Sequence, residues 1–115
     1  MANAKAGNIS HLLVESKGPW AGPSCAGFLR DAVELAESGQ RVRMLLIQDG
    51  VAAAVDGTLS APRELADADA ELWVDRFSFE QRGLPEAALP ATARLVDTAE
   101  ITAQILEPDV RVVWH

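Results

Sequence analysis

The first half of the chain alternates short apolar runs with one long segment of helical periodicity. Val42–Gln48 contains four consecutive apolar residues without alternation, which is typical of a strand covered on both faces of a parallel sheet. Ile9–Val14 is a second strand candidate. Between them, Ser24–Ser38 places apolar residues on one face and charged residues on the other, after Pro23 and before Gly39. This order predicts a β-α-β unit with a right-handed crossover.

Shorter elements of the same kind continue downstream. Further helices are predicted at Ser60–Ala70, at Ser78–Arg82 with a Ser-x-x-Gln cap, and from the Asp97/Glu100 capping box to about Leu106. Further strands are predicted at Glu71–Val74, Arg94–Val96 and Val110–Trp114. The pattern therefore predicts one α/β domain over residues 9–115, with a mostly parallel sheet of about five strands and helices on both faces, preceded by a flexible N-terminus over residues 1–8.

Composition and charge narrow the classes of function. The 115 residues fit one domain, and an apolar fraction of 49% supplies a core. Seventeen acidic against ten basic side chains leave a formal charge of −7, which argues against nucleic-acid binding and favours protein partners with basic patches. The first apolar run, Leu12–Val14, is too short for a signal peptide, and no stretch approaches the ~18 apolar residues of a membrane span. We therefore expect a cytoplasmic protein with no membrane contact.

Cys25 is the single thiol of the chain and its first candidate for chemistry. It falls in the first turn of the predicted helix, where backbone N–H groups and the helix dipole lower a thiol pKa and favour a nucleophilic thiolate. Lys17 could add positive charge to this site. Trp20, in the Gly/Pro-rich loop between strand and helix, could cover the thiol or contact a partner. The alternative is that Cys25 is a small buried hydrophobe facing the sheet.

Two carboxylates follow neighbouring predicted strands. Asp49 is expected to cap a helical turn over Val51–Val55, with Gly50 permitting a tight exit from the strand. Asp75 ends the next strand, so the two could form an acid–base pair, although carboxylates at helix starts are commonly caps. His11 and His115 match no metal-ligand spacing, and no phosphate-binding loop is present, so we expect neither a metal nor a cofactor.

These segments, taken together, resemble the DsrE/DsrF/DsrH family of sulfur-relay proteins, which includes TusB, TusC and TusD. The resemblance extends from about His11 to Trp114. It is carried by five segments: Lys17–Trp20 (Lys-Gly-Pro-Trp), Leu45–Val55 (Leu-Leu-Ile-Gln-Asp-Gly-Val-Ala-Ala-Ala-Val), Gln81–Leu84 (Gln-Arg-Gly-Leu), Leu95–Asp97, and Val113-Trp114, which is similar to the terminal tryptophan of the DsrH/TusB branch.

The resemblance implies a three-layer, flavodoxin-like subunit of intracellular sulfur transfer or oxidation. It implies self-association or assembly with paralogous subunits and contact with sulfur-carrier proteins. Independently of the resemblance, the apolar final strand is expected to be buried, with apolar area continuing at Trp114 into a subunit interface. Members that carry sulfur hold it as a persulfide on a cysteine. Beside that cysteine, Lys17, Trp20, Gln48, Asp49, Asp75 and Arg82 are expected to line the site.

The resemblance breaks at the acceptor position. The DsrE/TusD branch places its cysteine eight residues before the glycine of Arg-Gly, and that position is Asp75 here, which cannot hold a persulfide. The DsrH branch can carry a cysteine in the first helix, which makes Cys25 the candidate carrier. Two functions follow: a sulfur carrier, at most a sulfurtransferase, acting through Cys25, or a non-catalytic, oligomer-forming subunit without an acceptor cysteine.

Overall fold

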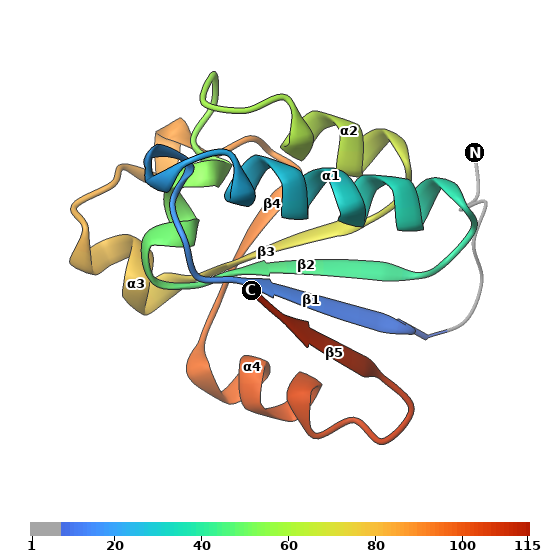
Figure 1. Cartoon of the computed structure of the whole chain (residues 1–115). Helices are drawn as coiled ribbons and strands as arrows, with labels where there is room; N and C mark the ends of the chain where they lie inside the picture. Colours follow the sequence, from blue (N-terminus) through green and yellow to red (C-terminus); the bar gives the residue numbers. More distant parts are fainter. Residues whose placement is uncertain (1–7) are drawn as a thin grey trace.

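Within residues 8–115, five parallel strands form one sheet. A computed structural model describes residues 8–115; the expected flexible N-terminus falls outside these residues except for Asn8. The sheet order is β4-β3-β2-β1-β5, and every neighbouring pair is parallel (Figure 1). The strands are β1 (His11–Glu15), β2 (Val42–Leu46), β3 (Glu71–Asp75), β4 (Ala93–Val96) and β5 (Arg111–Trp114).

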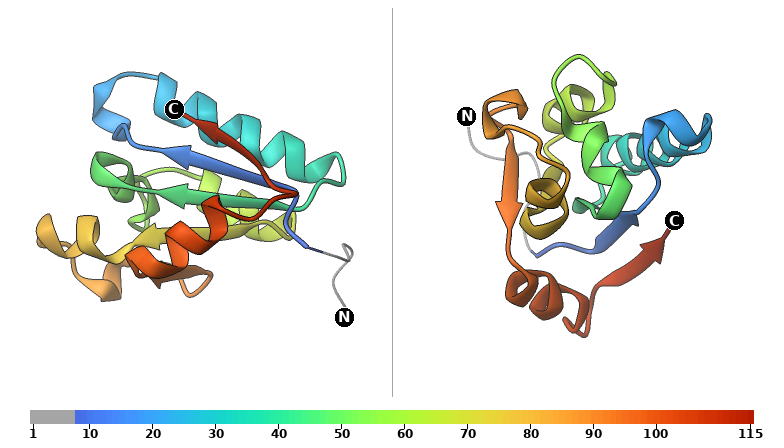
Figure 2. Two further views of the ribbon diagram at one scale, coloured as in Figure 1. Left: turned by 90° about the horizontal axis from the view of Figure 1, so that it is seen from below. Right: turned by 90° about the vertical axis from the view of Figure 1, so that its left-hand side faces the viewer.

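Helices cover both faces of the sheet, as the three-layer prediction requires. The α-helices are α1 (Ser24–Glu37), α2 (Ala61–Asp67), α3 (Arg76–Gln81) and α4 (Thr98–Ile105). The 3₁₀ helices are η1 (Pro19–Ala21), η2 (Gln48–Ala54) and η3 (Glu86–Ala88). Figure 1 shows α1 and α2 on one face and α4 on the other, and the views in Figure 2 agree with this division. The flavodoxin-like α/β class predicted from the sequence is confirmed.

The helix α1 illustrates why the sequence folds this way. Cys25, Leu29, Ala32, Val33 and Ala36 recur at helical spacing, and all five are buried against the sheet. The helix ends before a glycine with φ +103°, which a residue with a side chain rarely adopts. Its buried face joins β2, β3, η2 and α2 in the larger of two apolar clusters.

The face that carries α4 has a smaller core. Leu12, Val14, Leu45, Trp73 and Val96 are buried there. The helix begins with the predicted capping box, in which a glutamate side chain accepts from the backbone N–H of the capping aspartate at 3.2 Å. Within the described chain, α4 is the helix that packs on this face. With eight residues, it forms a smaller helical layer than α1 and α2 form together.

The predicted strands and helices are present, with ends shifted by a few residues, and one prediction of burial is wrong. The final strand was expected to be buried, but β5 lies at the edge of the sheet, and within the described residues it pairs only with β1. Val113 is 39% exposed and Trp114 is 57% exposed. An edge strand has a neighbour on one side only, which leaves its other side to solvent. Among residues 8–115, no helix has the length and apolarity needed to cross a membrane.

Candidate functional site

The carboxyl ends of β1, β2 and β3 lie side by side, so the loops that follow them share one edge of the molecule. In open parallel sheets this edge is where ligands and reactive groups gather. Two groups of polar residues lie there. We refer to Glu15, Cys25 and His115 as the thiol corner. We refer to Gln48, Asp49, Asp75, Ser78 and Arg82 as the cap corner.

The thiol of Cys25 is closed off from solvent. Its side chain lies in the first turn of α1, faces the sheet and has no exposed surface. The pKa of the Cys25 thiol is raised to about 11, mainly by burial and to a smaller extent by the nearby carboxylate of Glu15. The prediction of a lowered pKa is therefore wrong: the helix N-terminus favours a thiolate, but desolvation and the neighbouring negative charge outweigh it.

Glu15 and His115 join the thiol corner although sequence reasoning gave neither a role. Glu15 is fully buried at the end of β1. Nδ1 of His115 lies 2.8 Å from Oε1 and 3.0 Å from Oε2 of that carboxylate, and the imidazole stacks on Phe28 of α1 with ring centroids 4.8 Å apart. The sequence does contain one indication of this pair: Glu15 directly follows the buried Leu-Leu-Val run of β1, and a carboxylate buried there needs a partner.

Lys17 and Trp20 are both exposed in the segment between β1 and α1. Lys17 contributes its backbone N–H, which donates to Oε2 of Glu15 at 3.0 Å, while the residue itself is exposed. Trp20 lies in η1 with 67% of its surface exposed, and its ring packs against Gly18, where an added Cβ would lie 2.8 Å from ring atoms. Most of the Trp20 surface is therefore open to solvent beside the thiol corner.

The cap corner brings together the remaining four predicted site residues around Ser78. Oδ2 of Asp75 accepts from the backbone N–H of Ser78 at 3.3 Å and from its hydroxyl at 2.5 Å. The same hydroxyl oxygen accepts from the backbone N–H of Gln48 at 2.8 Å. Arg82 donates to Oδ1 of Asp49 at 2.9 and 3.1 Å and to the carbonyl oxygen of Ser78 at 3.1 Å.

Two capping predictions are corrected by these contacts. Asp75, not Ser78, is the N-cap of α3, and Ser78 is a buried residue within that helix. Asp49 lies inside η2, whose N-cap is Ile47, and its carboxylate is bound to Arg82. Both carboxylates therefore have structural partners, which leaves the acid–base hypothesis without a free pair.

Gln48 is the strained point of the cap corner. Its φ is +51°, in the left-handed region that residues other than glycine adopt infrequently. The hydrogen bond from its N–H to Ser78 holds this conformation at the exit of β2. Gly50, two residues further on, is constrained by close packing, because an added Cβ would lie 2.3 Å from the carbonyl oxygen of Glu15. The close contact of Gly50 with the backbone of Glu15 thus joins the segment of the cap corner to the thiol corner, and only glycine fits at position 50.

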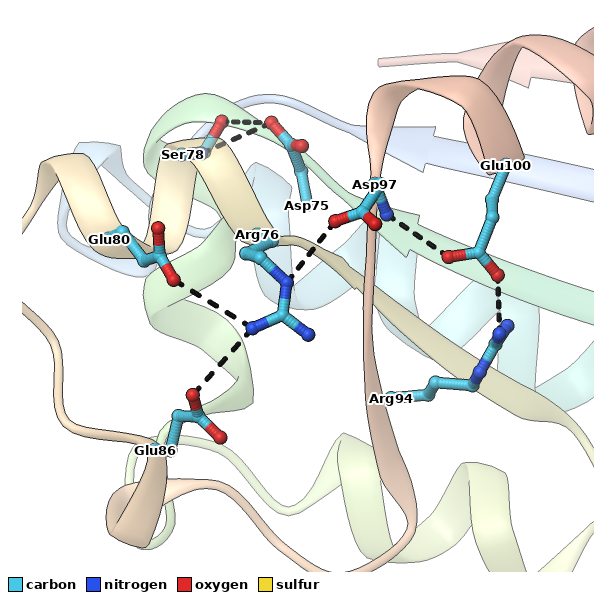
Figure 3. Close-up of polar contacts among 8 residues, drawn as sticks. All are labelled: Asp75, Arg76, Ser78, Glu80, Glu86, Arg94, Asp97 and Glu100. Carbon is cyan, nitrogen blue, oxygen red and sulfur yellow. Dashed lines mark hydrogen bonds and ion pairs between the residues drawn. The ribbon is translucent and has the colours of Figure 1, made fainter.

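Arg76 adds an ion-pair network beside the cap corner that sequence reasoning missed. Figure 3 shows its guanidinium between three carboxylates, those of Glu80 and Glu86 at 3.7 Å and that of Asp97 at 3.2 Å. These partners come from α3, η3 and the start of α4. The network ties together segments that the sheet alone does not connect.

A shallow cavity of about 430 Å³ lies apart from both corners, between α4 and the sheet. Trp73 forms part of its wall, with the guanidinium carbons of Arg43 and Arg94 at 3.9 and 5.3 Å from the ring centroid. Arg43 is paired with Glu71 at 2.7 Å. Within residues 8–115, no group of three His, Cys, Asp or Glu side chains is arranged to hold a metal ion.

Comparison with known proteins assigns the fold. The chain has the DsrE/YchN-like α/β fold. It superimposes on the ychN protein from E. coli with a TM-score of 0.82 at 19% sequence identity, covering 94% of this chain and 100% of that one. MTH1491 from Methanobacterium thermoautotrophicum, a protein of unknown function, gives a TM-score of 0.74 at 10% identity, covering 91% and 98%.

A third structure agrees with this assignment. BT1422 from Bacteroides thetaiotaomicron, a conserved protein of unknown function, gives a TM-score of 0.69 at 12% identity and covers 92% of this chain and 95% of its own. No protein-family model matches the sequence, and no curated protein matches it either. At these identities the likeness defines the fold and leaves the function to the site itself.

Proposed function

We propose that this chain is an assembly subunit of a DsrE/DsrH-like sulfur-relay system that binds protein partners and does not itself carry sulfur. The burial of Cys25 carries the proposal, because a thiol with no exposed surface and a pKa raised to about 11 is neither accessible nor ionised at neutral pH. Asp75 supports it from the other corner, since the residue in the family's acceptor position here caps α3.

The surface of the chain supports a binding role. Large apolar side chains are exposed at five positions of the described chain: Trp20, Phe77, Leu106, Val113 and Trp114. Aromatic side chains of this kind are enriched at protein interfaces. The acidic balance of the chain makes proteins with basic patches complementary partners. Copies of this chain, paralogous subunits of the DsrE family and sulfur-carrier proteins are the partners we propose.

Sulfur carriage by Cys25 is the competing function, and its position at the start of α1 favours it. The Cys25 thiolate would attack the outer sulfur of a sulfane donor. A new S–S bond would form on Cys25 as the donor's S–S bond breaks and its remaining part leaves with the electron pair. This step requires the first turn of α1 to open, because the thiol is enclosed in the folded chain.

Intact-mass measurement after incubation with polysulfide separates the two functions. We expect no adduct on the folded chain, and an adduct of about 32 Da per sulfur atom once the chain is unfolded in urea. Cys25→Ser serves as the control and should remain unmodified in both states. An adduct on the folded wild-type chain that disappears in Cys25→Ser would refute the proposal and establish the carrier function.

A further inference from the structure

The outer side of β5 carries backbone groups with no partner in the described chain. Arg111 donates its N–H to Ser10 at 2.9 Å, and His115 donates to Val14 at 2.8 Å and accepts from Ser16 at 3.1 Å. In a parallel ladder the residues that bond to the neighbouring strand alternate with residues that point away from it. Arg111, Val113 and His115 therefore face β1.

The N–H and C=O groups of Val112 and Trp114 consequently point outward, away from β1. Figure 1 and the right-hand view of Figure 2 show β5 as the outermost strand on this side. The side chains of Val113 and Trp114 are 39% and 57% exposed. An exposed apolar edge of this kind is a template for pairing with another strand.

The opposite edge of the sheet is protected. Strand β4 has no exposed large apolar side chain, and its central Arg94 is ion-paired with Glu100. The Arg76 network joins the residues on either side of β4, from Glu86 to Asp97. Charges on an edge strand discourage pairing, so the two edges of one sheet differ in the property that controls association.

We propose that β5 pairs antiparallel with β5 of a second copy of this chain, across a two-fold axis beside Val113. This inference rests on the proposed assembly function and specifies its interface. In this register Val112 of each copy lies opposite Trp114 of the other. Each such pair exchanges two N–H to C=O bonds, so the free groups of both strands form four hydrogen bonds. The contact is the same patch on both copies, as a two-fold interface requires.

Side chains and charges favour this register. Val112 and Trp114 are both on the α4 side of the sheet, because they align with Leu12 and Val14, so each exposed Trp114 would pack against a valine. Arg111 of one copy would lie opposite His115 of the other, whose imidazole holds the carboxylate of Glu15. Parallel pairing in register would instead bring the two Arg111 side chains together.

The alternative antiparallel register satisfies fewer groups. If Val112 lay opposite Val112, Trp114 would lie opposite Val110 of the second copy. The N–H of Val110 already donates to the carbonyl oxygen of Glu107 at 3.3 Å. The C=O of Trp114 in each copy would then lack a donor, so the register centred on Val113 is the one that pairs every outward N–H and C=O of Val112 and Trp114.

Sedimentation velocity of the full chain with two variants tests this interface. Val112→Pro removes an N–H that points outward. An edge strand tolerates proline at such a position, so the fold should be retained. Trp114→Lys places a charge on the same edge. We expect a dimer of the wild-type chain whose dissociation constant rises about tenfold or more in each variant. Leu106→Lys, which changes an exposed apolar residue off the strand, is the matched control and should leave the dimer intact.

Hydrogen exchange provides a second readout on the wild-type chain. The amides of Val112 and Trp114 should become protected as the protein concentration rises, while the amide of Val113 is protected at every concentration. A dimer that persists in Trp114→Lys, or a wild-type chain that stays monomeric, would overturn the pairing. Sulfur uptake by the folded chain would overturn the proposed function instead, so the two failures are distinguishable.

Discussion

The thiol corner and the cap corner lie at the carboxyl end of the same sheet, but they differ in how they treat their polar groups. In the thiol corner the thiol of Cys25 and the carboxylate of Glu15 are fully buried, the carboxylate is paired with His115, and its charge disfavours ionisation of the thiol. In the cap corner Asp49 is exposed and Arg82 is partly exposed, and the two side chains form an ion pair. A position at this edge of the sheet therefore does not by itself make a side chain reactive, because reactivity also depends on its exposure to solvent and on the groups that bind it.

The largest expected effect comes from the backbone contact that joins the two corners. Gly50→Ala would place a Cβ 2.3 Å from the carbonyl oxygen of Glu15, and backbone atoms cannot yield as a flexible side chain can. We expect urea denaturation to show a loss of about 2–3 kcal/mol in the free energy of unfolding. Gly27→Ala is the control, because Gly27 is exposed in α1 with open space around it and the change should stabilise by about 0.5–1 kcal/mol.

Glu15→Gln tests the thiol corner directly. Loss of the charge weakens the contact with His115 and should cost about 1–2 kcal/mol of unfolding free energy. The pKa of Cys25 should fall, because a negative charge that disfavours the thiolate is gone, but stay above 9.0, because burial is the larger cause of its shift. Ultraviolet absorbance of the thiolate measures this pKa. Glu107→Gln, an exposed residue, is the charge-matched control and should change neither quantity.

The raised thiol pKa also predicts a pH dependence of stability. The thiol ionises near pH 9.0 in the unfolded chain and near pH 11 in the folded one, so the unfolded state loses its proton first as the pH rises. Stability contributed by the protonated thiol is therefore complete below pH 9 and falls between pH 9 and 11. The difference in unfolding free energy between the wild type and Cys25→Ser isolates this contribution; a difference that is flat across that range would contradict burial of the thiol.

A smaller effect is expected at the cap of α3. Asp75→Ala removes the acceptor for the backbone N–H and hydroxyl of Ser78, which should cost about 1 kcal/mol in denaturant unfolding. Asp75→Asn retains an acceptor oxygen and should lose less. Equal losses in the two variants would show that the charge, and not the cap geometry, stabilises this helix.

The smallest effect is expected for the ion pair at the surface of the cap corner. Asp49→Asn should cost about 0.2–1 kcal/mol, because the pair with Arg82 is partly exposed to solvent. The loss should shrink as salt is added, since exposed charges are screened. Asp31→Asn, at an exposed position on α1, controls for the change in net charge. If Asp49→Asn lost as much unfolding free energy as Gly50→Ala, the polar contacts of the exposed cap corner would matter as much to stability as those of the buried thiol corner.

The elements could be predicted because their information is local. Apolar spacing and flanking Pro and Gly placed α1 close to its observed bounds, and the capping box placed the start of α4. The burial of Cys25 was also accessible, since it occupies the same helical face as Leu29 and Ala36. Helix polarity alone predicts a lowered thiol pKa, which is wrong because Cys25 lies on the buried face of the helix.

The remaining features depend on contacts between distant segments. Glu15 and His115 are 100 residues apart, and they meet only because β5 pairs with β1. The exposure of Trp114 follows from the same strand order, which hydrophobicity does not encode. The pairing of Asp49 with Arg82 likewise depends on how η2 packs against α3. Such contacts follow from the strand order, which local patterns of spacing and hydrophobicity do not reveal.

The pairing of β1 with β5 has a consequence for how the protein is made. About 100 residues separate β1 from β5 along the chain, so one side of β1 stays unpaired during synthesis until β5 has left the ribosome. Parallel contacts between such distant segments form slowly, because a long loop must close first. During this interval the apolar Leu-Leu-Val run of β1 is an open edge, which is the stage at which a growing chain is most prone to aggregate.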